Sequence, residues 1–194
     1  MNLTGILRDR AAAHPDRTAF ISAAERVTYG KFDRRVDRVA NALRASGVRP
    51  GDRIAVLDKN SLEYAELLFA AARAGAVQVP VNYRLSPDEI AYIVNNAKAP
   101  VLVAGPEFVP ALDAIADRLD HTRHLIITDP PGHARQGGHA YQDYAAWTDR
   151  PATPVDDSGE VFVQLYSSGT TGLPKGVMLT HHNFLAMLPM TQRT

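Results

Sequence analysis

From about residue 50 to residue 128, the hydrophobic positions follow two patterns in turn. Short continuous apolar runs are typical of buried strands, whereas apolar residues at intervals of three and four are typical of helices that bury one face. The runs predict strands at 54–57, 77–81, 101–104 and 125–128. Because strands that alternate with helices form βαβ units, the sequence predicts an α/β fold with a mostly parallel sheet and flanking helices.

The helices between these strands have recognisable start and stop signals. Asn60 and Ser61 are both cap candidates before an apolar stripe that ends at Gly75. The segment Ser86-Pro87-Asp88-Glu89 contains a capping box, in which Ser caps the helix, Pro takes its first position and Glu its third. A stripe at 109–119 predicts the helix before the fourth strand, and a stripe at about 29–46 predicts a longer helix ahead of the sheet.

The chain divides into segments by composition and pattern. We expect leading helices and short strands at 1–50, βαβ units at 51–128, an irregular excursion at 129–158, and a strand, loop, strand and helix start at 159–194. The excursion is rich in Pro, Gly and polar residues, which favour turns, and it contains a short stretch at about 141–147 that predicts a brief helix. The 194 residues are enough for one sizeable domain or for part of a larger one, and length alone does not separate these cases.

Composition and charge exclude several classes of protein. Hydrophobic residues make up 45% of the chain and charged residues 22%, as in ordinary globular proteins. The 21 basic and 21 acidic side chains balance, so no broad positive field exists that would attract nucleic acid. The absence of cysteine excludes disulfides and thiol chemistry, and it favours a cytoplasmic location.

No segment is predicted to cross a membrane or to direct secretion. Residues 1–16 have charges among their apolar positions, so they lack the continuous apolar core of a signal peptide and are expected to form a helix. The most apolar stretch, 67–81, is interrupted by Arg73 and is shorter than the ~20 apolar residues that span a bilayer.

One short segment carries the candidate chemistry. Residues 166–179 are YSSGTTGLPKGVML, and they connect two apolar runs, 160–166 and 177–179, that predict strands. The segment offers hydroxyl groups, glycines and one ammonium group: Ser167, Ser168, Thr170, Thr171, Gly169, Gly172, Gly176 and Lys175. Hydroxyls, backbone N–H groups and a lysine that converge in a glycine-rich turn can bind phosphate oxygens, so the sequence predicts a polyphosphate site.

Two other interpretations apply to a loop of this composition. Gly, Ser and Thr are also the usual residues of flexible linkers, and composition alone leaves that alternative open. The loop does not match the G-x-x-x-x-G-K-[ST] pattern of common nucleoside-triphosphate-binding proteins, because Pro174 stands where the second glycine is required and no helix start follows. The order of the residues is therefore more informative than their composition.

That order resembles the pattern of a known family. Residues 167–183, SSGTTGLPKGVMLTHHN, closely resemble the signature loop of the adenylate-forming superfamily, which comprises acyl-CoA synthetases, luciferases and the adenylation domains of peptide synthetases. Two further segments, 27–43 and 73–94, resemble the early helix and the second conserved block of the same family. The likeness covers most of the chain, and it implies the amino-terminal part of the large domain of such an enzyme.

The resemblance implies a two-step reaction. Family members activate a carboxylic acid with ATP and Mg²⁺ to an acyl-adenylate, and they then transfer the acyl group to a thiol, usually that of coenzyme A. By position, the residues that clamp the phosphates would be Ser167, Ser168, Gly169, Thr170, Thr171, Gly172 and Lys175. Most members have Thr where this chain has Ser167, a change that keeps the hydroxyl group. The catalytic lysine of the family lies in a later domain, so the chain alone is expected to be inactive.

The resemblance favours a fatty acid as the substrate, and two alternatives stay open. Residues 79–103 look more like bacterial acyl-CoA synthetases for fatty or aryl acids than like peptide-synthetase adenylation domains. The alternatives are an enzyme that adenylates an aryl or amino acid, and a truncated nucleotide-binding or interaction module without catalysis. An amino-terminal portion alone would leave an apolar sheet face uncovered, so we also expect self-association.

Other charged residues are given structural roles. On the helix at 29–46, charged side chains are expected to pair with one another on a solvated face: Arg34, Arg35 and Arg38 with Asp33 and Asp37. No cysteine or well-spaced carboxylate accompanies His121 and His124, or His181 and His182, so we predict no metal site there. By the resemblance, His181 is expected to pack beneath the nucleotide site.

Overall fold

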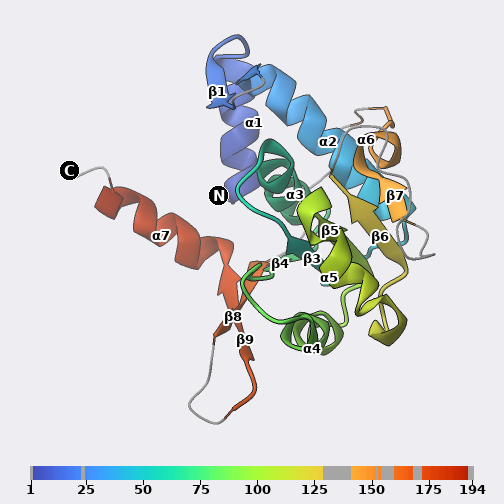
Figure 1. The fold of residues 1–194 in the computed structure, drawn as a ribbon. Coiled ribbons are helices and arrows are strands. Elements are labelled where there is room, and N and C mark those ends of the chain that lie inside the picture. The colour runs from blue at the N-terminus through green and yellow to red at the C-terminus, as the bar shows by residue number, and fades with distance from the viewer. Residues whose placement is uncertain are drawn as a thin grey trace.

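The computed structural model describes residues 2–22, 25–128, 141–151, 153, 160–167 and 172–191, except the side chains of 141 and 187–191. Its main strands are β3 (Arg53–Leu57), β4 (Val77–Pro80), β5 (Val101–Ala104), β6 (His124–Ile127), β7 (Tyr141–Asp143), β8 (Val161–Ser167) and β9 (Lys175–Thr180). They form a seven-stranded sheet in the order β7-β6-β5-β3-β4-β8-β9 (Figure 1). A separate hairpin pairs β1 (Thr18–Ile21) with β2 (Arg26–Thr28).

Neighbouring strands of the large sheet are parallel except β8 and β9, which form an antiparallel pair. β3 pairs with β4 on one side and with β5 on the other, so the later strands extend the sheet in both directions from β3. From β4 to β7 this order is that of a doubly wound sheet. The mostly parallel sheet predicted from the alternating pattern is thus confirmed.

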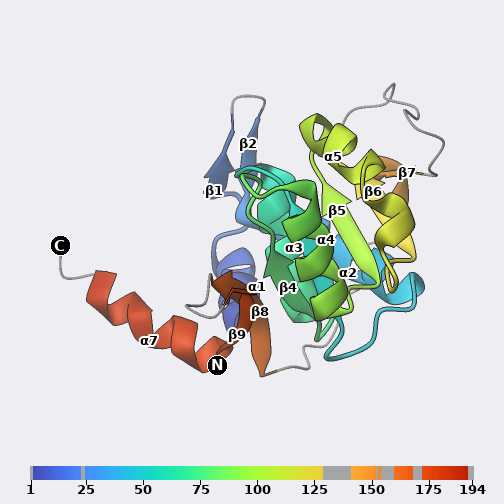
Figure 2. The ribbon, with the colours of Figure 1, turned by 60° about the horizontal axis from the view of Figure 1, so that its bottom comes forward.

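Helices cover both faces of this sheet. They are α1 (Leu3–Ala13), α2 (Tyr29–Ala45), α3 (Leu62–Arg73), α4 (Pro87–Ala97), α5 (Val109–Asp113), α6 (Tyr144–Trp147) and α7 (His181–Thr191). The β1–β2 hairpin lies at one end of the molecule, and α7 projects away from the sheet and the other helices (Figure 2). None of the helices that the structure describes is both long and apolar enough to cross a membrane.

The start signals read from the sequence are confirmed. Ser61 Oγ accepts a hydrogen bond from Tyr64 N at 3.0 Å at the start of α3. At the start of α4, Ser86 and Glu89 form the predicted capping box, in which each side chain accepts from the backbone N–H of the other residue. These caps satisfy N–H groups that have no partner within the helix.

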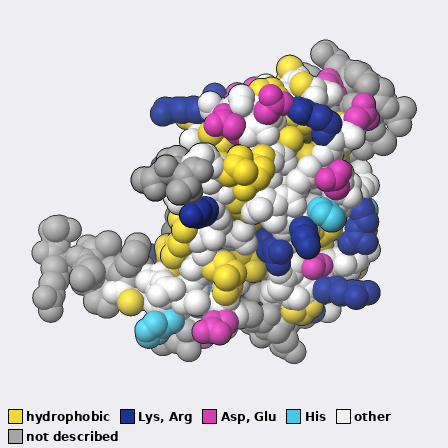
Figure 3. All heavy atoms as spheres, turned by 90° about the horizontal axis from the view of Figure 1, so that it is seen from below, with side chains coloured by type: hydrophobic (Ala, Val, Ile, Leu, Met, Phe, Trp, Pro, Cys, Tyr) yellow, Lys and Arg dark blue, Asp and Glu magenta, His cyan; other side chains and the backbone are white. Residues whose placement is uncertain are grey.

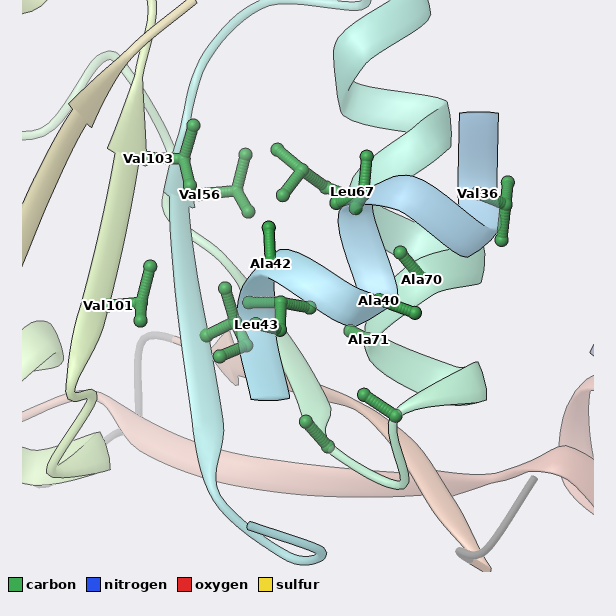
Figure 4. Packing of buried hydrophobic residues seen from close by; sticks show 14 of the residues in the cluster. Val36, Ala40, Ala42, Leu43, Val56, Leu67, Ala70, Ala71, Val101 and Val103 are labelled. Atoms are coloured by element: carbon green, nitrogen blue, oxygen red, sulfur yellow. The ribbon is translucent and has the colours of Figure 1, made fainter. Parts of the chain in front are cut away.

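Two apolar layers hold the helices on the sheet. The first lies between the sheet and the helices α2 and α3, and Figure 4 shows among its members Val36, Leu43, Leu67, Val56 and Val103. The second lies between the opposite face of the sheet and α4 with α5. Along β3, Ile54 and Val56 face the first layer, whereas Ala55 and Leu57 face the second. Burial on both faces explains why such strands appear as continuous apolar runs in the sequence.

Two segments differ from the sequence prediction. The stripe at 109–119 forms α5 and the 3₁₀ turn Ala116–Arg118, not one continuous helix. Leu112 and Ile115 are nevertheless fully buried, because Ile115 N donates a hydrogen bond to the Leu112 carbonyl at 3.0 Å, and this 3₁₀-type turn keeps residues three apart on one side. Residues 141–143, within the predicted excursion, form β7 and pair with β6. A strand of three residues is too short to show an alternation of apolar and polar positions in the sequence. Residues 129–140 lie outside the described part of the chain.

A buried arginine joins α3 to α2. Arg73 is fully buried, and its terminal nitrogens lie 2.6 Å from Asp33 Oδ1 and 2.8 Å from Asp37 Oδ1. The prediction that Asp33 and Asp37 pair with arginines of their own helix is therefore wrong. Arg35 instead lies 2.6 Å from Glu25 Oε1. A buried guanidinium requires carboxylate partners, whereas exposed arginines can remain solvated.

Glu66 of α3 is a second buried ionisable residue, and it contacts Tyr144, the first residue of α6. Glu66 Oε2 accepts a hydrogen bond from the Tyr144 hydroxyl at 3.1 Å, and Arg35 Nε lies 3.5 Å from Glu66 Oε1. Burial raises the pKa of Glu66 from 4.5 to about 7, against the opposing effect of Arg35. The carboxyl group therefore binds its proton more tightly in the folded protein than in the unfolded chain.

Removal of Arg73 should destabilise the fold strongly. Arg73→Met leaves Asp37 buried without its closest cation, and breaking a buried ion pair costs about 3–5 kcal/mol. The control is Arg118→Met, which breaks the exposed Arg118–Asp88 pair and should cost about 0–1 kcal/mol. Urea unfolding measures both free energies, and equal values for the two variants would contradict the assigned role of Arg73.

Glu66 should make the stability of the fold depend on pH. Between pH 4.5 and about pH 7 the folded state binds more protons than the unfolded state, so the free energy of unfolding falls as the pH rises and levels off above that range. Glu66→Gln should remove this fall and be more stable than the wild type at about pH 8. Glu63→Gln, on the same helix, should retain it. Urea unfolding across this pH range gives the slopes, and identical slopes in the two variants would disprove the assignment.

Candidate functional site

The carboxyl ends of the parallel strands β3, β4 and β8 meet at one edge of the sheet, where ligands bind in open α/β sheets. A cleft of about 600 Å³ opens at this edge. Its lining comes from the segments after β3 and β4, from α4 and from the end of β8, and it includes Asp58, Asn82, Tyr83, Ile93 and Tyr166. The sequence alone does not predict this cleft, because its lining residues come from segments that are far apart along the chain.

Asp58 follows β3 and is held in a fixed position within the cleft. Its Oδ1 accepts a hydrogen bond from Lys59 N at 2.7 Å, and its Oδ2 accepts from Ser61 Oγ at 3.2 Å and Thr128 Oγ1 at 3.4 Å. Burial raises the pKa of Asp58, and these hydrogen bonds oppose the rise. Gly105, after β5, lies so near that a Cβ there would collide with Asp58 Oδ1.

The rim of the cleft carries two cationic side chains around one aromatic ring. Lys59 Nζ lies 5.8 Å and Arg84 Cζ 5.6 Å from the centre of the Tyr83 ring. Lys59 Nζ also lies 2.8 Å from Glu107 Oε1. Cations near the face of an aromatic ring are attracted by its electron density, so Tyr83 helps to hold both at the rim.

The candidate phosphate loop connects β8 to β9. The strand register places Ser167 opposite Lys175, and both residues are exposed. Directly opposed residues of antiparallel strands point to the same face, so both side chains project from one face of the hairpin at the mouth of the loop. Gly172 has a φ of +104°, a backbone conformation that favours glycine. The other predicted phosphate ligands lie outside the described residues: Ser168, Gly169, Thr170 and Thr171.

Both ends of this loop are hydrogen-bonded to α4. The Tyr166 hydroxyl donates to Asn96 Oδ1 at 2.6 Å and accepts from Gln164 Nε2 at 2.9 Å. The Tyr92 hydroxyl donates to the Pro174 carbonyl at 3.3 Å. The sequence predicts the helix that carries Tyr92 and Asn96, but it does not show which hairpin the folded helix will contact.

His181 begins α7 and is buried against β8. Its ring stacks on that of Phe162 with the centroids 5.0 Å apart, and its Nδ1 accepts a hydrogen bond from Leu3 N at 3.3 Å. His181 therefore has a packing role. Within the described ranges, no three His, Asp or Glu side chains form a group that could hold a metal ion.

The hairpin that carries the loop also exposes apolar surface. Four of its side chains are between 42% and 65% exposed: Leu165, Leu173, Val177 and Met178. Figure 3 views the molecule from below and shows hydrophobic side chains on the part of the visible surface nearest to the projecting α7. In the described part of the chain, β9 ends the sheet and has no partner strand on its outer edge. Apolar surface beside an unpaired edge favours association with further polypeptide.

A doubly wound sheet with a glycine-rich hairpin loop at its carboxyl edge defines a class of α/β proteins whose sites lie where the strands end. Within this class, the chain belongs to the AMP-binding enzyme family, which residues 7–193 match. This match confirms the family suggested by the order of residues 167–183.

Several curated relatives are similar to the chain over most of its length. It is 36% identical over 177 residues to a fatty acid–[acyl-carrier-protein] ligase of Streptomyces coeruleorubidus, covering 91% of this chain and 32% of that protein. It is 40% identical over 174 residues to a feruloyl-CoA synthase of Amycolatopsis sp, covering 90% and 32%. It is 35% identical over 188 residues to a long-chain-fatty-acid–CoA ligase of Mycobacterium tuberculosis, covering 94% and 35%. The chain thus spans about a third of the length of these relatives.

Solved structures confirm the fold. An anthranilate CoA ligase in complex with anthranoyl-AMP superposes with a TM-score of 0.88 at 28% identity, covering 97% of this chain and 36% of that chain. The N-terminal domain of FACL13 from Mycobacterium tuberculosis superposes with a TM-score of 0.80 at 31% identity, covering 93% and 44%. The chain therefore has the fold of the corresponding part of these enzymes.

Glycine at position 176 should be needed for full stability of the fold, because Gln164 lies close to it across the hairpin. A Cβ at Gly176 would collide with Gln164 Nε2, so Gly176→Ala should displace the amide and break its hydrogen bond to Tyr166. The expected loss is about 1 kcal/mol of unfolding free energy. Gln164→Ala removes the obstacle, so Gly176→Ala should cost less in that background. Urea unfolding of the wild type, both single variants and the double variant tests this coupling, and additive effects would contradict it.

Proposed function

We propose that this chain binds the triphosphate of ATP as part of an acid–thiol ligase, an enzyme that joins a carboxylic acid to coenzyme A. The observation that carries the proposal is the pairing of Ser167 with Lys175 at the mouth of a glycine-rich loop on the carboxyl edge of the sheet. A hydroxyl donor and an ammonium group on one face of a hairpin suit phosphate oxygens. Membership of the AMP-binding enzyme family supports the assignment.

Activation is required because a carboxylate is a poor electrophile toward a thiol. An ATP-dependent ligase first forms an acyl-adenylate, whose AMP is a good leaving group, and the thiol then displaces that AMP. In this chain, the loop would bind the phosphates that depart as pyrophosphate and keep the α-phosphorus in line with the attacking carboxylate oxygen. Lys175 would offset the negative charge that builds on the departing group.

The loop residues would divide this work by chemical type. Hydroxyl donors would come from Ser167, Ser168, Thr170 and Thr171, and close backbone approach from Gly169 and Gly172. Magnesium would accompany the triphosphate, and we assign no ligand to it within the described residues. No catalytic residue is assigned either, because the proposed role of the loop is to bind and orient the phosphates and to offset their charge.

We propose a fatty acid as the carboxylic acid substrate, with an aromatic acid as the alternative. Two of the relatives described above are named as ligases of fatty acids, which supports the first choice. The feruloyl-CoA synthase and the anthranilate CoA ligase support the second. A panel that contains both kinds of acid is therefore needed in any assay.

The full encoded protein should release pyrophosphate from ATP only when a suitable acid is present, and form the thioester when coenzyme A is added. Lys175→Met should raise the KM for ATP by about tenfold to a hundredfold, because a hydrogen bond to a charged group contributes about 1.5–3 kcal/mol. Lys98→Met, an exposed lysine at the end of α4, is the matched control and should leave this KM unchanged.

Two outcomes would count against the proposal. An unchanged KM for ATP in Lys175→Met would contradict the phosphate contact. ATP binding without pyrophosphate release, for every fatty and aromatic acid in the panel, would contradict the ligase activity and would favour a nucleotide-binding module without catalysis.

A further inference from the structure

The loop-bearing end of the β8–β9 hairpin has little attachment to the sheet. Within the described residues, β8 pairs with β4 only at Val163, opposite Gln78. Among the strands that the structure describes, residues 164–167 pair with β9 alone, and β9 has no neighbour on its other side. Figure 1 shows the hairpin reaching past the sheet, with α4 beside it. The position of the loop therefore depends on contacts other than the strand pairing of the sheet.

We propose that α4 is the positioning element of the phosphate loop, and that Tyr92 and Asn96 hold its two ends in place. The proposal rests on the function proposed above, since it assumes that the loop binds phosphate. It concerns residues outside the loop, which contact neither the phosphates nor the reacting atoms and act through the loop alone.

The two residues are placed to act together. Tyr92 and Asn96 lie four residues apart, so they project from the same face of α4. Asn96 Oδ1 accepts from the Tyr166 hydroxyl at 2.6 Å on the β8 side of the loop. The Tyr92 hydroxyl donates to the Pro174 carbonyl at 3.3 Å on the β9 side. The hairpin residues in these bonds, Tyr166 and Pro174, directly precede the opposed pair Ser167 and Lys175 that is proposed to bind phosphate.

Packing and hydrogen bonding reinforce these contacts. The Tyr92 and Tyr166 rings pack against the apolar layer that α4 forms with the sheet. A ring buried at its base with a hydroxyl at its tip combines apolar packing with a directed hydrogen bond. Burial raises the pKa of Tyr166, so its hydroxyl stays protonated and remains a donor to Asn96. Gln164 Nε2 donates to the same oxygen, which satisfies it as an acceptor.

Hydrogen bonds to α4 at both ends of the loop restrict its movement more than a bond at one end would. With a single hydrogen bond this end of the hairpin could pivot about that point, whereas one bond on each side of the loop fixes its direction relative to α4. The separation of the two strands is already fixed by the pairing of Ser167 with Lys175. Groups that are held in place before a ligand arrives lose less conformational entropy on binding. They also keep the phosphates aligned with the attacking group. Loss of either bond should therefore weaken ATP binding.

Trypsin cleavage after Lys175 measures the attachment without ATP, because cleavage of a folded chain follows the population of its locally opened state. Tyr92→Phe and Asn96→Ala in the full encoded protein should each accelerate this cleavage by about twofold to tenfold, the effect of one lost hydrogen bond. Tyr29→Phe is the matched control. Within the described chain the Tyr29 hydroxyl makes no hydrogen bond, so its rate should equal that of the wild type.

A second cleavage site in the same digest reports general stability. Lys59 is exposed and lies outside the hairpin. Equal acceleration after Lys59 and after Lys175 would mean that the variants only destabilise the fold, and it would overturn the proposal. An unchanged rate after Lys175 would overturn it as well.

Steady-state kinetics with ATP separate this inference from the proposed function. Faster cleavage after Lys175 together with a higher KM for ATP supports both. Faster cleavage in a protein that neither binds nor consumes ATP supports attachment of the hairpin by α4 but contradicts the proposed function. Faster cleavage with an unchanged KM for ATP would overturn the positioning role while leaving the proposed function intact.

Discussion

The parallel pairing of β3 with both β4 and β5 is the constraint on which the rest of the structure depends. Parallel neighbours must be joined by crossover connections, which place α3 on one face of the sheet and α4 on the other. The same pairing brings the carboxyl ends of the strands to one edge, where β8 also ends. Asp58, Asn82 and Ser167 therefore share a region of the molecule although they are far apart in the sequence.

The two faces of the sheet are stabilised by different interactions. The layer beneath α4 is formed by aliphatic side chains, which tolerate small adjustments. The layer beneath α2 and α3 is bordered by Arg73 with its carboxylate partners and by Glu66 with Tyr144. Because an unpaired buried charge is costly, this side of the fold has fewer acceptable arrangements. The helix that supports the apolar face, α4, also carries the side chains that reach the hairpin.

The candidate site and a group of exposed apolar side chains occur on the same hairpin. Leu165, Val177 and Met178 are exposed on the strands that carry the loop, and β9 is the edge of the sheet as far as the structure describes it. Any polypeptide that covered this surface would therefore also border the loop. The chain matches its family over nearly its whole length yet spans about a third of its curated relatives.

The sequence by itself determined the type of most of the main elements, although not of β7, and it located the signature segment that suggested the family. Apolar runs located β3 to β6 to within one residue at each end, because burial on both faces requires continuous apolar residues. The order of residues 167–183 was sufficient to indicate the family. Only the tertiary structure decided the partners of Arg73, the cleft at Asp58 and the contacts of Tyr92 and Asn96 with the hairpin. Those contacts join residues 36 to 82 positions apart, and the direction and order of the strands, which no local pattern encodes, bring them together.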